Sequence, residues 1–430
     1  MRALLSLLLF LSPDLAVTMP DGPPANSIAN TGHGHSQPNH TIYASHYSGT
    51  VYALQFEPGR SRLYPIQILQ SCGDKPSWLT IDRESRTLYC LDDSGELGIG
   101  ERGHLTEFAI NPNGTLVEKA HVETMPGAVH ATLYTKNNKK FIAIATRTAT
   151  VQTFALPLKS SDKPLQSLQL DDPVKSTPYA VYLDPIKESF IFVLDYGTDK
   201  IHIFPINDDG HLADSECEVR DIHKEAEAPP HLGIARAVFT WVFGKIQARL
   251  FVFSSITSTR VVYDVVYHES DGCPSLRRVR NVEEQDMRPK EAKRAVNRAY
   301  NITEAKAVDG QHIYLGLCVN DSHSSIWEYC EASGSVSCGY KDMEKVGTDI
   351  LFHRKDSPAY GDCPRSFDFS PSGFYMAIGN RVSSTIAIVS RDPESYGALG
   401  DRITEHPVGG KGSLEEGTGL SSVVWGLMNG

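Results

Sequence analysis

The chain has 430 residues, a formal net charge of −11, 40% hydrophobic residues and 22% charged residues. These values are typical of a globular protein that is long enough to bury a large core. The acidic balance argues against nucleic acid or an anionic membrane surface as a partner. At this length the chain holds either several ordinary domains or one large repeat architecture.

The N-terminus has the layout of a secretory signal peptide. Arg2 precedes an apolar run at 3–11, and small residues follow as far as Thr18. This pattern predicts a signal peptide at 1–18, and the apolar run is too short to span a bilayer. A short buried strand is the alternative. Residues 19–38 are rich in Gly, Pro, Ser and Asn and lack periodicity, so we expect a flexible leader there.

Sequons and cysteines also indicate export. N-glycosylation sequons occur at Asn39, Asn113, Asn301 and Asn320. They can be used only in a secretory lumen, and eight cysteines without a CxxC pair fit an oxidising compartment better than a zinc site. Cys330 and Cys338 flank a Gly-containing turn between two strand-like runs, so we predict that they form a disulfide. We therefore expect a secreted protein, free or associated with a cell wall.

Short runs rich in Val, Ile, Tyr and Phe recur between Gly, Pro, Asn and Asp clusters, and helical periodicity is nearly absent. One unit of three such strands and two turns occurs at 76–95, 128–156, 179–206, 234–265, 302–329 and 364–390. A seventh unit is split, because 421–425 resembles its opening strand and 41–56 resembles the strands that should follow.

A repeat whose first and last pieces come from opposite ends of the chain closes a ring and removes exposed sheet edges. The spacing of roughly 50 to 70 residues is near the length of a four-stranded blade. The sequence therefore predicts an all-β fold, a seven-bladed β-propeller over 39–430 closed by its N- and C-terminal strands. A solenoid would have capping repeats instead of a split one.

The innermost strand of each blade lines the axis of a propeller, so residues at the same place in every unit should converge there. Those places hold Trp78, His130, Tyr179, Arg236, Glu304 and Arg365. The arginines can hold carboxylate or phosphate oxygens, and a glutamate or histidine can transfer a proton. The pattern predicts an anion site, although an Arg–Glu pair on the axis can also be structural.

Two other patterns fail on context. Residues 98–103 match GxGxxG but lead into a strand-like run instead of a helix, which argues against a dinucleotide site. Histidines between 33 and 46 lack acidic or thiol ligands nearby. We expect neither a metal nor a cofactor.

The units resemble the seven-bladed lactonase family, which includes 6-phosphogluconolactonases and the fungal secreted 3-carboxy-cis,cis-muconate cyclases. The segment LDPIKESFIFVLDYGTDKIHIFPI at 183–206 is similar to the family pattern LDP…FVxDxGxDxIxxF, and 364–390 is similar to PRxFxxSPxGxxxxxxNxxSxTIxV. The resemblance covers essentially the whole mature chain. It implies lactone hydrolysis, or addition of a carboxylate to an alkene within one molecule and its reverse, with no metal or organic cofactor.

The resemblance carries over to the candidate site only in part. Arg236 and Glu304 match family positions, whereas Tyr179 stands where the family has a histidine and Ser255 where it has a glutamate. A third substitution, in the segment around Asn320, replaces a family arginine.

Two functions remain open. The first is a secreted lactonase- or cycloisomerase-like protein of the carboxymuconate cyclase type, acting on a small carboxylated or lactone substrate. Arg236, Arg365 and Tyr179 would bind the anion, and Glu304 or His130 would transfer the proton. The second is a non-catalytic secreted glycoprotein that binds a cell wall or an extracellular protein. In both cases we expect a monomer.

Overall fold

The computed structural model describes residues 38–95, 102–222, 231–241, 247–256, 259–268, 272–279, 285–286, 300–308, 312–319, 324–331, 344–345, 351–393 and 397–429. Residues 37–430 belong to one compact unit. The predicted signal peptide, all of the predicted leader except its last residue, Asn320 and Cys338 lie outside the described residues, so these assignments remain predictions.

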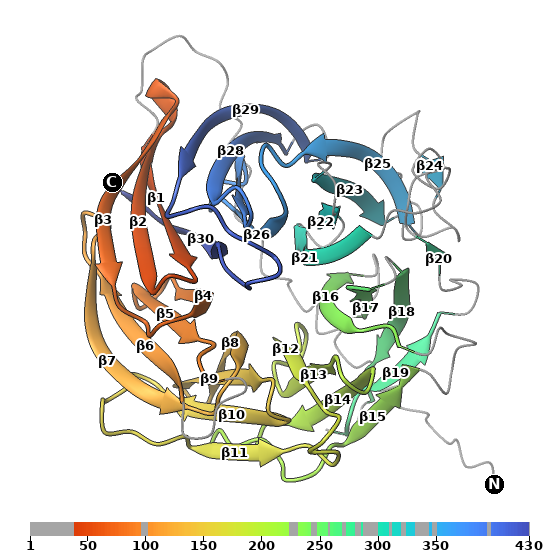
Figure 1. Ribbon diagram of the computed structural model, residues 1–430. Coiled ribbons are helices and arrows are strands. Elements are labelled where there is room, and N and C mark those ends of the chain that lie inside the picture. Colours follow the sequence, from red (N-terminus) through yellow and green to blue (C-terminus); the bar gives the residue numbers. More distant parts are fainter. Residues whose placement is uncertain are drawn as a thin grey trace, which may run out of the picture. The chain divides into compact units, whose positions relative to one another are not determined.

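The described strands form a ring of seven antiparallel sheets, each of which is one blade (Figure 1). Blade 1 consists of β1 (Asn39–His46), β2 (Thr50–Glu57), β3 (Arg62–Gln70) and β30 (Leu420–Asn429), with the short 3-10 helix η1 (Pro58–Arg60) before β3. Blade 2 consists of β4 (Pro76–Asp82), β5 (Thr87–Asp92), β6 (Gly103–Ile110) and β7 (Leu116–Thr124). Blade 3 consists of β8 (Ala128–Lys136), β9 (Lys139–Thr146), β10 (Thr150–Ala155) and β11 (Gln166–Gln169).

The other four blades follow in chain order. Blade 4 consists of β12 (Pro178–Leu183), β13 (Phe190–Asp195), β14 (Lys200–Pro205) and β15 (Glu218–Asp221). Blade 5 consists of β16 (Ile234–Trp241), β17 (Ala248–Ser254), β18 (Thr259–Val266) and β19 (Ser275–Arg278), with β20 (Gln285–Asp286) paired to β18. Blade 6 consists of β21 (Tyr300–Val308), β22 (His312–Val319), β23 (Ser325–Glu331), β25 (Leu351–Pro358) and β24 (Glu344–Lys345). Blade 7 consists of β26 (Pro364–Phe369), β27 (Tyr375–Asn380), β28 (Thr385–Asp392) and β29 (Ala398–Pro407).

The innermost strands are β4, β8, β12, β16, β21, β26 and β30, and they contact one another around the ring. In blade 1 the C-terminal β30 pairs with the N-terminal β1, with Tyr43 opposite Val424. This pairing confirms the seven-bladed propeller and the split seventh unit predicted from the sequence.

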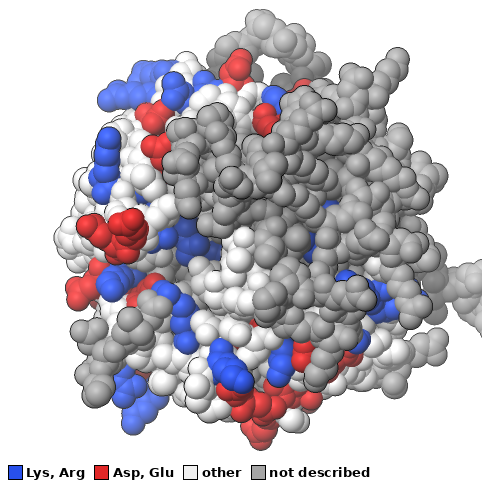
Figure 2. All heavy atoms as spheres, turned by 45° about the vertical axis from the view of Figure 1, so that its right-hand side comes forward, with Lys and Arg blue, Asp and Glu red and all other residues white. Residues whose placement is uncertain are grey.

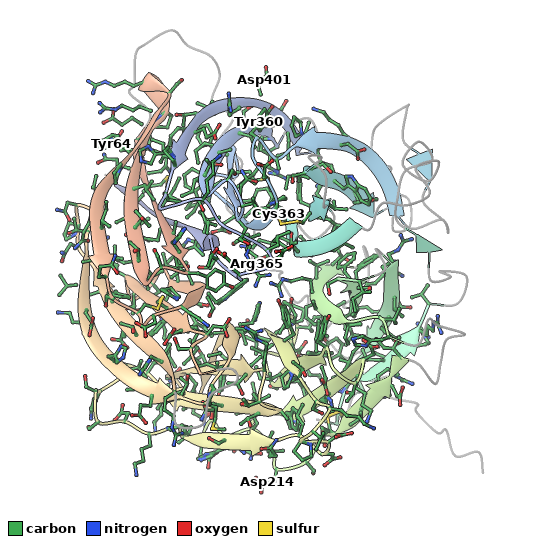
Figure 3. The ribbon with its side chains drawn as sticks, in the orientation of Figure 1. Tyr64, Asp214, Tyr360, Cys363, Arg365 and Asp401 are labelled. Carbon is green, nitrogen blue, oxygen red and sulfur yellow. A yellow bond between two sulfur atoms is a disulfide. The ribbon has the colours of Figure 1, made fainter. Side chains whose placement is uncertain are left out.

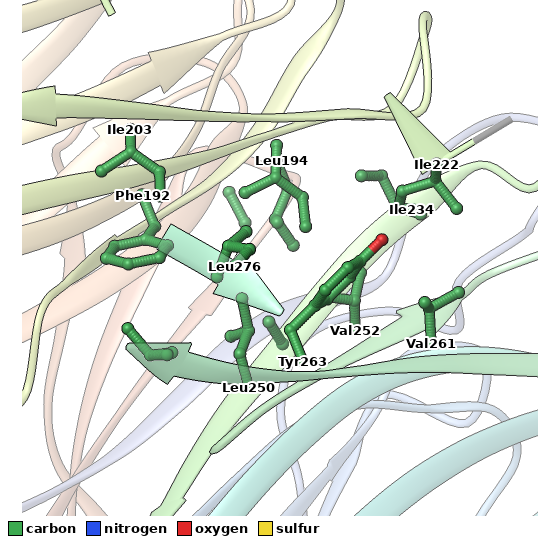
Figure 4. Close-up of a cluster of buried hydrophobic side chains, with 14 of the residues drawn as sticks. Phe192, Leu194, Ile203, Ile222, Ile234, Leu250, Val252, Val261, Tyr263 and Leu276 are labelled. Atoms are coloured by element: carbon green, nitrogen blue, oxygen red, sulfur yellow. The ribbon is translucent and has the colours of Figure 1, made fainter. Parts of the chain in front are cut away.

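Each sheet is buried on both faces, which explains why its strands are apolar runs instead of alternating ones. In β13, Phe192 and Leu194 pack toward blade 5, whereas the intervening Ile191 and Val193 pack toward blade 3. Figure 4 shows the first of these layers, where Phe192 and Leu194 meet residues of blade 5 such as Leu250. The described core consists of seven such clusters, each shared by two neighbouring blades.

Three disulfides crosslink the described part of the chain. They join Cys72 to Cys90, Cys217 to Cys273 and Cys318 to Cys363. They are consistent with an oxidising compartment. Within the described residues, no helix has the length and apolar character needed to cross a membrane.

The seam that closes the ring generates a first prediction. Trp425 is fully buried, packs edge-on against His40 and Phe56, and its indole N–H donates to the Asp368 carbonyl of blade 7 at 2.8 Å. We expect Trp425→Ala to lower the free energy of unfolding by about 3–5 kcal/mol, because it leaves a large cavity between blades. Denaturant unfolding measures this. The exposed Val174→Ala is the control, and equal effects from the two variants would contradict the assigned role of the seam.

Candidate functional site

Every innermost strand carries a register shift close to its first residue. The residue that the neighbouring strand skips is, in the successive blades, Ser421, Ser77, Val129, Tyr179, Ala235, Thr303 and Arg365. Such a β-bulge leaves one residue unpaired and redirects its side chain. The bulges lie on the face of the ring at which the innermost strands begin.

This register divides the predicted site residues into two groups. Tyr179 and Arg365 are the bulged residues of blades 4 and 7, whereas the other four predicted residues directly follow the bulges of their blades. The expectation that all six occupy one equivalent place is therefore wrong, because Tyr179 and Arg365 stand one place earlier in their strands, relative to the bulge, than the other four. The tyrosine and Arg365 are partly exposed, and the group that follows the bulges is buried.

The structure nevertheless brings the six residues into one continuous set of contacts, here called the axial cluster. It consists of Trp78, His130, Tyr179, Arg236, Glu304 and Arg365. The Arg236 guanidinium lies 5.6 Å from the Trp78 ring and 5.2 Å from the Tyr179 ring, and its Nε lies 3.5 Å from Glu304 Oε1. The Trp78 and His130 rings are 4.3 Å apart. Arg365 lies toward the centre of the ring in Figure 3, whereas Tyr64, Asp214 and Asp401 lie on its outside.

Tyr179 and Arg365 form the more exposed part of the axial cluster. Arg365 Nη2 donates a hydrogen bond to the Tyr179 hydroxyl at 3.5 Å. The positive charge of Arg365 and, to a smaller extent, the charges of Arg236 and Arg147 outweigh burial and lower the pKa of Tyr179 from 10.0 to about 7. A phenol with this pKa exists in both protonation states near neutral pH.

Arg236 and Glu304 form the buried part. Both residues are almost fully enclosed, with 1% and 2% exposure. Arg236 Nε and Nη2 and Glu304 Oε2 make no hydrogen bond, so the ion pair is the main compensation for their burial. A buried pair of this kind is strongly destabilising when only one partner is removed.

His130 is held in its neutral form. Burial is the largest cause, followed by the nearby charges of Arg236, Lys306 and Arg365, and together they lower its pKa well below 6.5. The Val181 amide donates to His130 Nδ1 at 3.3 Å, which makes Nδ1 the acceptor nitrogen. His130 therefore contributes a neutral ring, not a charge, near neutral pH.

A second ring of residues surrounds the bulges, and among its described members the sequence analysis named only Ser255. Each of these rim residues directly follows the second strand of its blade. The described ones are Tyr47, Asp93, Arg147, Tyr196, Ser255 and Arg381. The Tyr196 ring lies 5.6 Å from the Tyr179 ring, and Tyr47 shares a hydrogen bond with Arg365. In the sequence these residues share only their position, since each is the first residue after the second apolar run of its unit.

The rim adds positive charge to a molecule whose net charge is negative. Arg147 pairs with Asp93, and the Arg381 guanidinium lies 5.2 Å from the Tyr47 ring. Among the described residues, Arg365 and Arg381 have no carboxylate partner. Together the axial cluster and the rim contain four arginines and two carboxylates, an arrangement that can bind a small anion through charge-assisted hydrogen bonds.

Other polar residues near this end of the ring support the backbone. Asp195 Oδ1 accepts the Thr177 and Gly197 amides, and the Asn380 side-chain amide donates to the Ala359 carbonyl. A pocket of about 400 Å³ beside blade 2 is lined in part by the Asp92–His104 pair. The Asp92 carboxylate also accepts a hydrogen bond from the Lys75 amide, so Asp92 supports the backbone of blade 2 in the way that Asp195 supports that of blade 4. In the described segments, no group of three or more His, Cys, Asp or Glu could hold a metal ion.

A seven-bladed propeller with an arginine-rich axial cluster defines the class of this protein. The family model described as "Lactonase, 7-bladed beta-propeller" matches residues 41–336 and 343–415, and the chain belongs to that family. The comparison with curated proteins gives no match.

Solved structures support the fold assignment. A periplasmic gluconolactonase of Pseudomonas aeruginosa is 18% identical, with a TM-score of 0.68 over 91% of this chain and 99% of the other. A putative 6-phosphogluconolactonase of Bacteroides fragilis is 17% identical, with a TM-score of 0.65 over 91% and 99%. A protein of Lactobacillus plantarum is 15% identical, with a TM-score of 0.66 over 90% and 99%. At these identities the likeness establishes the fold.

The electrostatics of Tyr179 generate a second prediction. We expect one tyrosine of the folded protein to ionise near pH 7, and Tyr179→Phe to abolish this transition. Arg365→Ala should move the transition toward pH 10.0, because it removes the largest cause of the shift. Titration of the tyrosinate ultraviolet absorbance measures both effects. Tyr134→Phe is the control, since burial raises the pKa of Tyr134, and loss of the transition in that variant instead would refute the assignment.

The buried ion pair generates a third prediction. We expect Arg236→Met to lower the free energy of unfolding by about 3–5 kcal/mol, because Glu304 is then buried without a partner. The double variant with Glu304→Met should regain most of that loss. Denaturant unfolding of both variants decides the matter. A double variant as unstable as the single one would show that pairing is not the reason for the loss.

Proposed function

We propose that this lactonase-family protein binds a small carboxylated lactone, or the corresponding ring-opened acid, at the axial cluster, with Tyr179 as the proton-transferring group. The pKa of about 7 carries the proposal, because Tyr179 is then available both as an acid and as a base near neutral pH. General acid–base catalysis is most effective when the pKa of the group lies near the operating pH. The phenol takes the place of the histidine found in similar family members.

The arginines give the substrate its orientation in this proposal. Arg365 binds one carboxylate beside Tyr179, and Arg381 and Arg147 on the rim bind further anionic oxygens, since guanidinium groups match carboxylates in pairs of hydrogen bonds. On the face that Figure 2 draws, the basic and acidic side chains of the described residues are interspersed.

The same residues serve both reactions that the family resemblance implies. In cyclisation, a carboxylate oxygen of the substrate bonds to an alkene carbon while Tyr179 gives its proton to the neighbouring carbon. In the reverse direction, the tyrosinate removes that proton and the carbon–oxygen bond breaks to restore the alkene and the carboxylate. In lactone hydrolysis, the tyrosinate takes the proton of the water that adds to the carbonyl carbon. The ring carbon–oxygen bond then breaks, and Tyr179 gives the proton to the leaving oxygen, which becomes the hydroxyl of the ring-opened acid. We propose the carboxymuconate cyclase type of chemistry as the finer assignment.

Glu304 and His130 take supporting roles in this proposal. Glu304 forms an ion pair with Arg236, and the Arg236 guanidinium lies over the Tyr179 ring. The ion pair therefore helps to fix the position of the Tyr179 phenol. His130 is neutral and packs against Trp78. Their assignment as proton donors stays a prediction, and the geometry favours Tyr179.

The cellular setting forms part of the same proposal. The signal-peptide pattern, the sequons and the three disulfides support a secreted glycoprotein, free or associated with a cell wall. Asn113 is exposed in the turn between β6 and β7, where a glycan can be accommodated. We propose a monomer that binds neither nucleic acid nor a membrane.

One observation favours a second function, a non-catalytic secreted glycoprotein that binds a cell wall or an extracellular protein. Glu304 matches a family site position, but its carboxylate is engaged in a buried ion pair with Arg236. Ser255 replaces a second family carboxylate. In that case the arginines would still bind an anionic group, but no bond would be made or broken.

The fourth prediction separates these two functions. We expect the full chain to convert 3-carboxymuconate or a member of a panel of small lactones. Arg365→Ala should weaken binding of the substrate by about tenfold to a hundredfold, the usual cost of a lost charge-assisted hydrogen bond. Tyr179→Phe should abolish turnover while binding is largely retained. Calorimetric titration and a turnover assay measure the two effects.

Arg60→Ala is the matched control, because Arg60 is an exposed residue of η1, beside the outermost strand of blade 1, and pairs with Glu57. Binding and turnover should be unchanged in this variant. Anion binding without turnover in the unmodified protein would instead support the binding function. If no substrate of the panel binds at all, the anion site is refuted.

A further inference from the structure

We propose that the Cys318–Cys363 disulfide is the positioning element of the anion site, so that removing it weakens anion binding at the axial cluster. The inference rests on the proposed function, because it names what holds that site in place. Cys363 stands two residues before Arg365, and Cys318 stands one residue before the end of β22. The bond therefore joins blade 6 to the start of the innermost strand of blade 7, as Figure 3 shows beside Cys363 and Arg365.

Two further contacts from blade 6 hold the same short segment. The Cys363 amide donates to Ser324 Oγ at 2.6 Å. The Thr303 hydroxyl, at the bulge of blade 6, donates to the Pro364 carbonyl. The residues that lead directly into Arg365 are thus tied to the neighbouring blade by one covalent bond and two hydrogen bonds.

The rim arginine of blade 7 depends on this segment as well. The Arg381 amide donates to the Cys363 carbonyl at 2.7 Å, and the Val382 amide donates to the Asp362 carbonyl at 3.0 Å. Arg365 is therefore linked to the disulfide through the chain, and Arg381 through backbone hydrogen bonds. Arg365 and Arg381, the arginines of the axial cluster and the described rim that have no carboxylate partner, are thus positioned from the same point.

The backbone of the segment is held in a conformation that residues with a Cβ seldom adopt. Tyr360 and Cys363 have φ angles of 55° and 59°, in the left-handed region that residues with a Cβ rarely adopt. Such conformations persist only where the surrounding structure enforces them. Between them, Gly361 lies so close to Asn380 that an added Cβ would be 2.4 Å from its side-chain nitrogen. Without the sulfur bond, Cys363 can return to an extended conformation and displace Arg365 from Tyr179.

The simpler explanation is that the bond only stabilises the fold. Cys217–Cys273 provides the comparison, because it also joins two neighbouring blades but lies beside their outermost strands, β15 and β19. Its cysteines are 56 residues apart in the chain, against 45 for Cys318 and Cys363. Disulfides that close loops of similar length restrict the unfolded chain to a similar extent. A purely stabilising role thus predicts similar behaviour for both.

The experiment compares the full-length double variants C318A/C363A and C217A/C273A at a temperature where both are folded. Citrate serves as the probe in calorimetric titration, and the tyrosinate absorbance of Tyr179 is titrated in parallel. We expect C318A/C363A to weaken citrate binding by about tenfold to a hundredfold, the usual cost of a lost charge-assisted hydrogen bond, here the one from Arg365. The ionisation of Tyr179 should move from near pH 7 toward pH 10.0 in this variant alone.

Equal citrate affinities and equal tyrosine titrations in the two double variants would overturn the proposal. If the unmodified protein binds no citrate, the proposed anion function is in question, but the tyrosine titration still tests whether the disulfide positions Arg365. If C318A/C363A does not fold, C318S/C363S takes its place, because a hydroxyl is close in size to a thiol and cannot form the bond. That variant should shift both readouts in the same direction, and an unchanged titration there would also overturn the proposal.

Discussion

Burial of both faces of every sheet is the constraint on which this structure depends. A β13 strand in which Phe192 faces one neighbour and Val193 the other is stable only between two blades. No blade can then stand at an end, so the chain must close on itself, and the pairing of β1 with β30 supplies the closure. The innermost strands meet around the axis, and there the polar side chains of the axial cluster are brought together.

The bulges turn that general feature into a site. Without the extra residue, Tyr179 and Arg365 would pair with the neighbouring strand of their blades. Each side chain would then point into one of the two apolar faces of its blade. The bulge releases them from the register, and across the axis they meet as a hydrogen-bonded pair. The following residues return to the ladder but still reach the axis, and Arg236 and Glu304 form a buried ion pair there. One device thus produces both the exposed and the buried part of the axial cluster.

This arrangement also decides what the sequence can predict. The six units and the split seventh can be predicted, because strand composition and turn residues are local features that a single sequence contains. All six predicted axial residues do come together. The register shift is invisible in the sequence, because Ser77 or Val129 looks like any strand residue, and the rim arginines Arg147 and Arg381 lie in turns where charge is expected for solubility. The pairing of Cys318 with Cys363 depends on contact between different blades, which spacing does not encode.

The positive charge of the surrounding arginines explains why a phenol, and not an imidazole, suits the centre of the site. A histidine surrounded by Arg365, Arg236 and Arg147 would lose its proton, as His130 does deeper in the cluster, and could act only as a base. The same positive charges have the opposite consequence for a tyrosine, because they stabilise its anion and bring an ordinarily weak acid into the neutral range. The number of arginines that bind the substrate and the identity of the proton-transferring group are therefore not independent. A site this rich in guanidinium groups favours an acid whose charged form is negative.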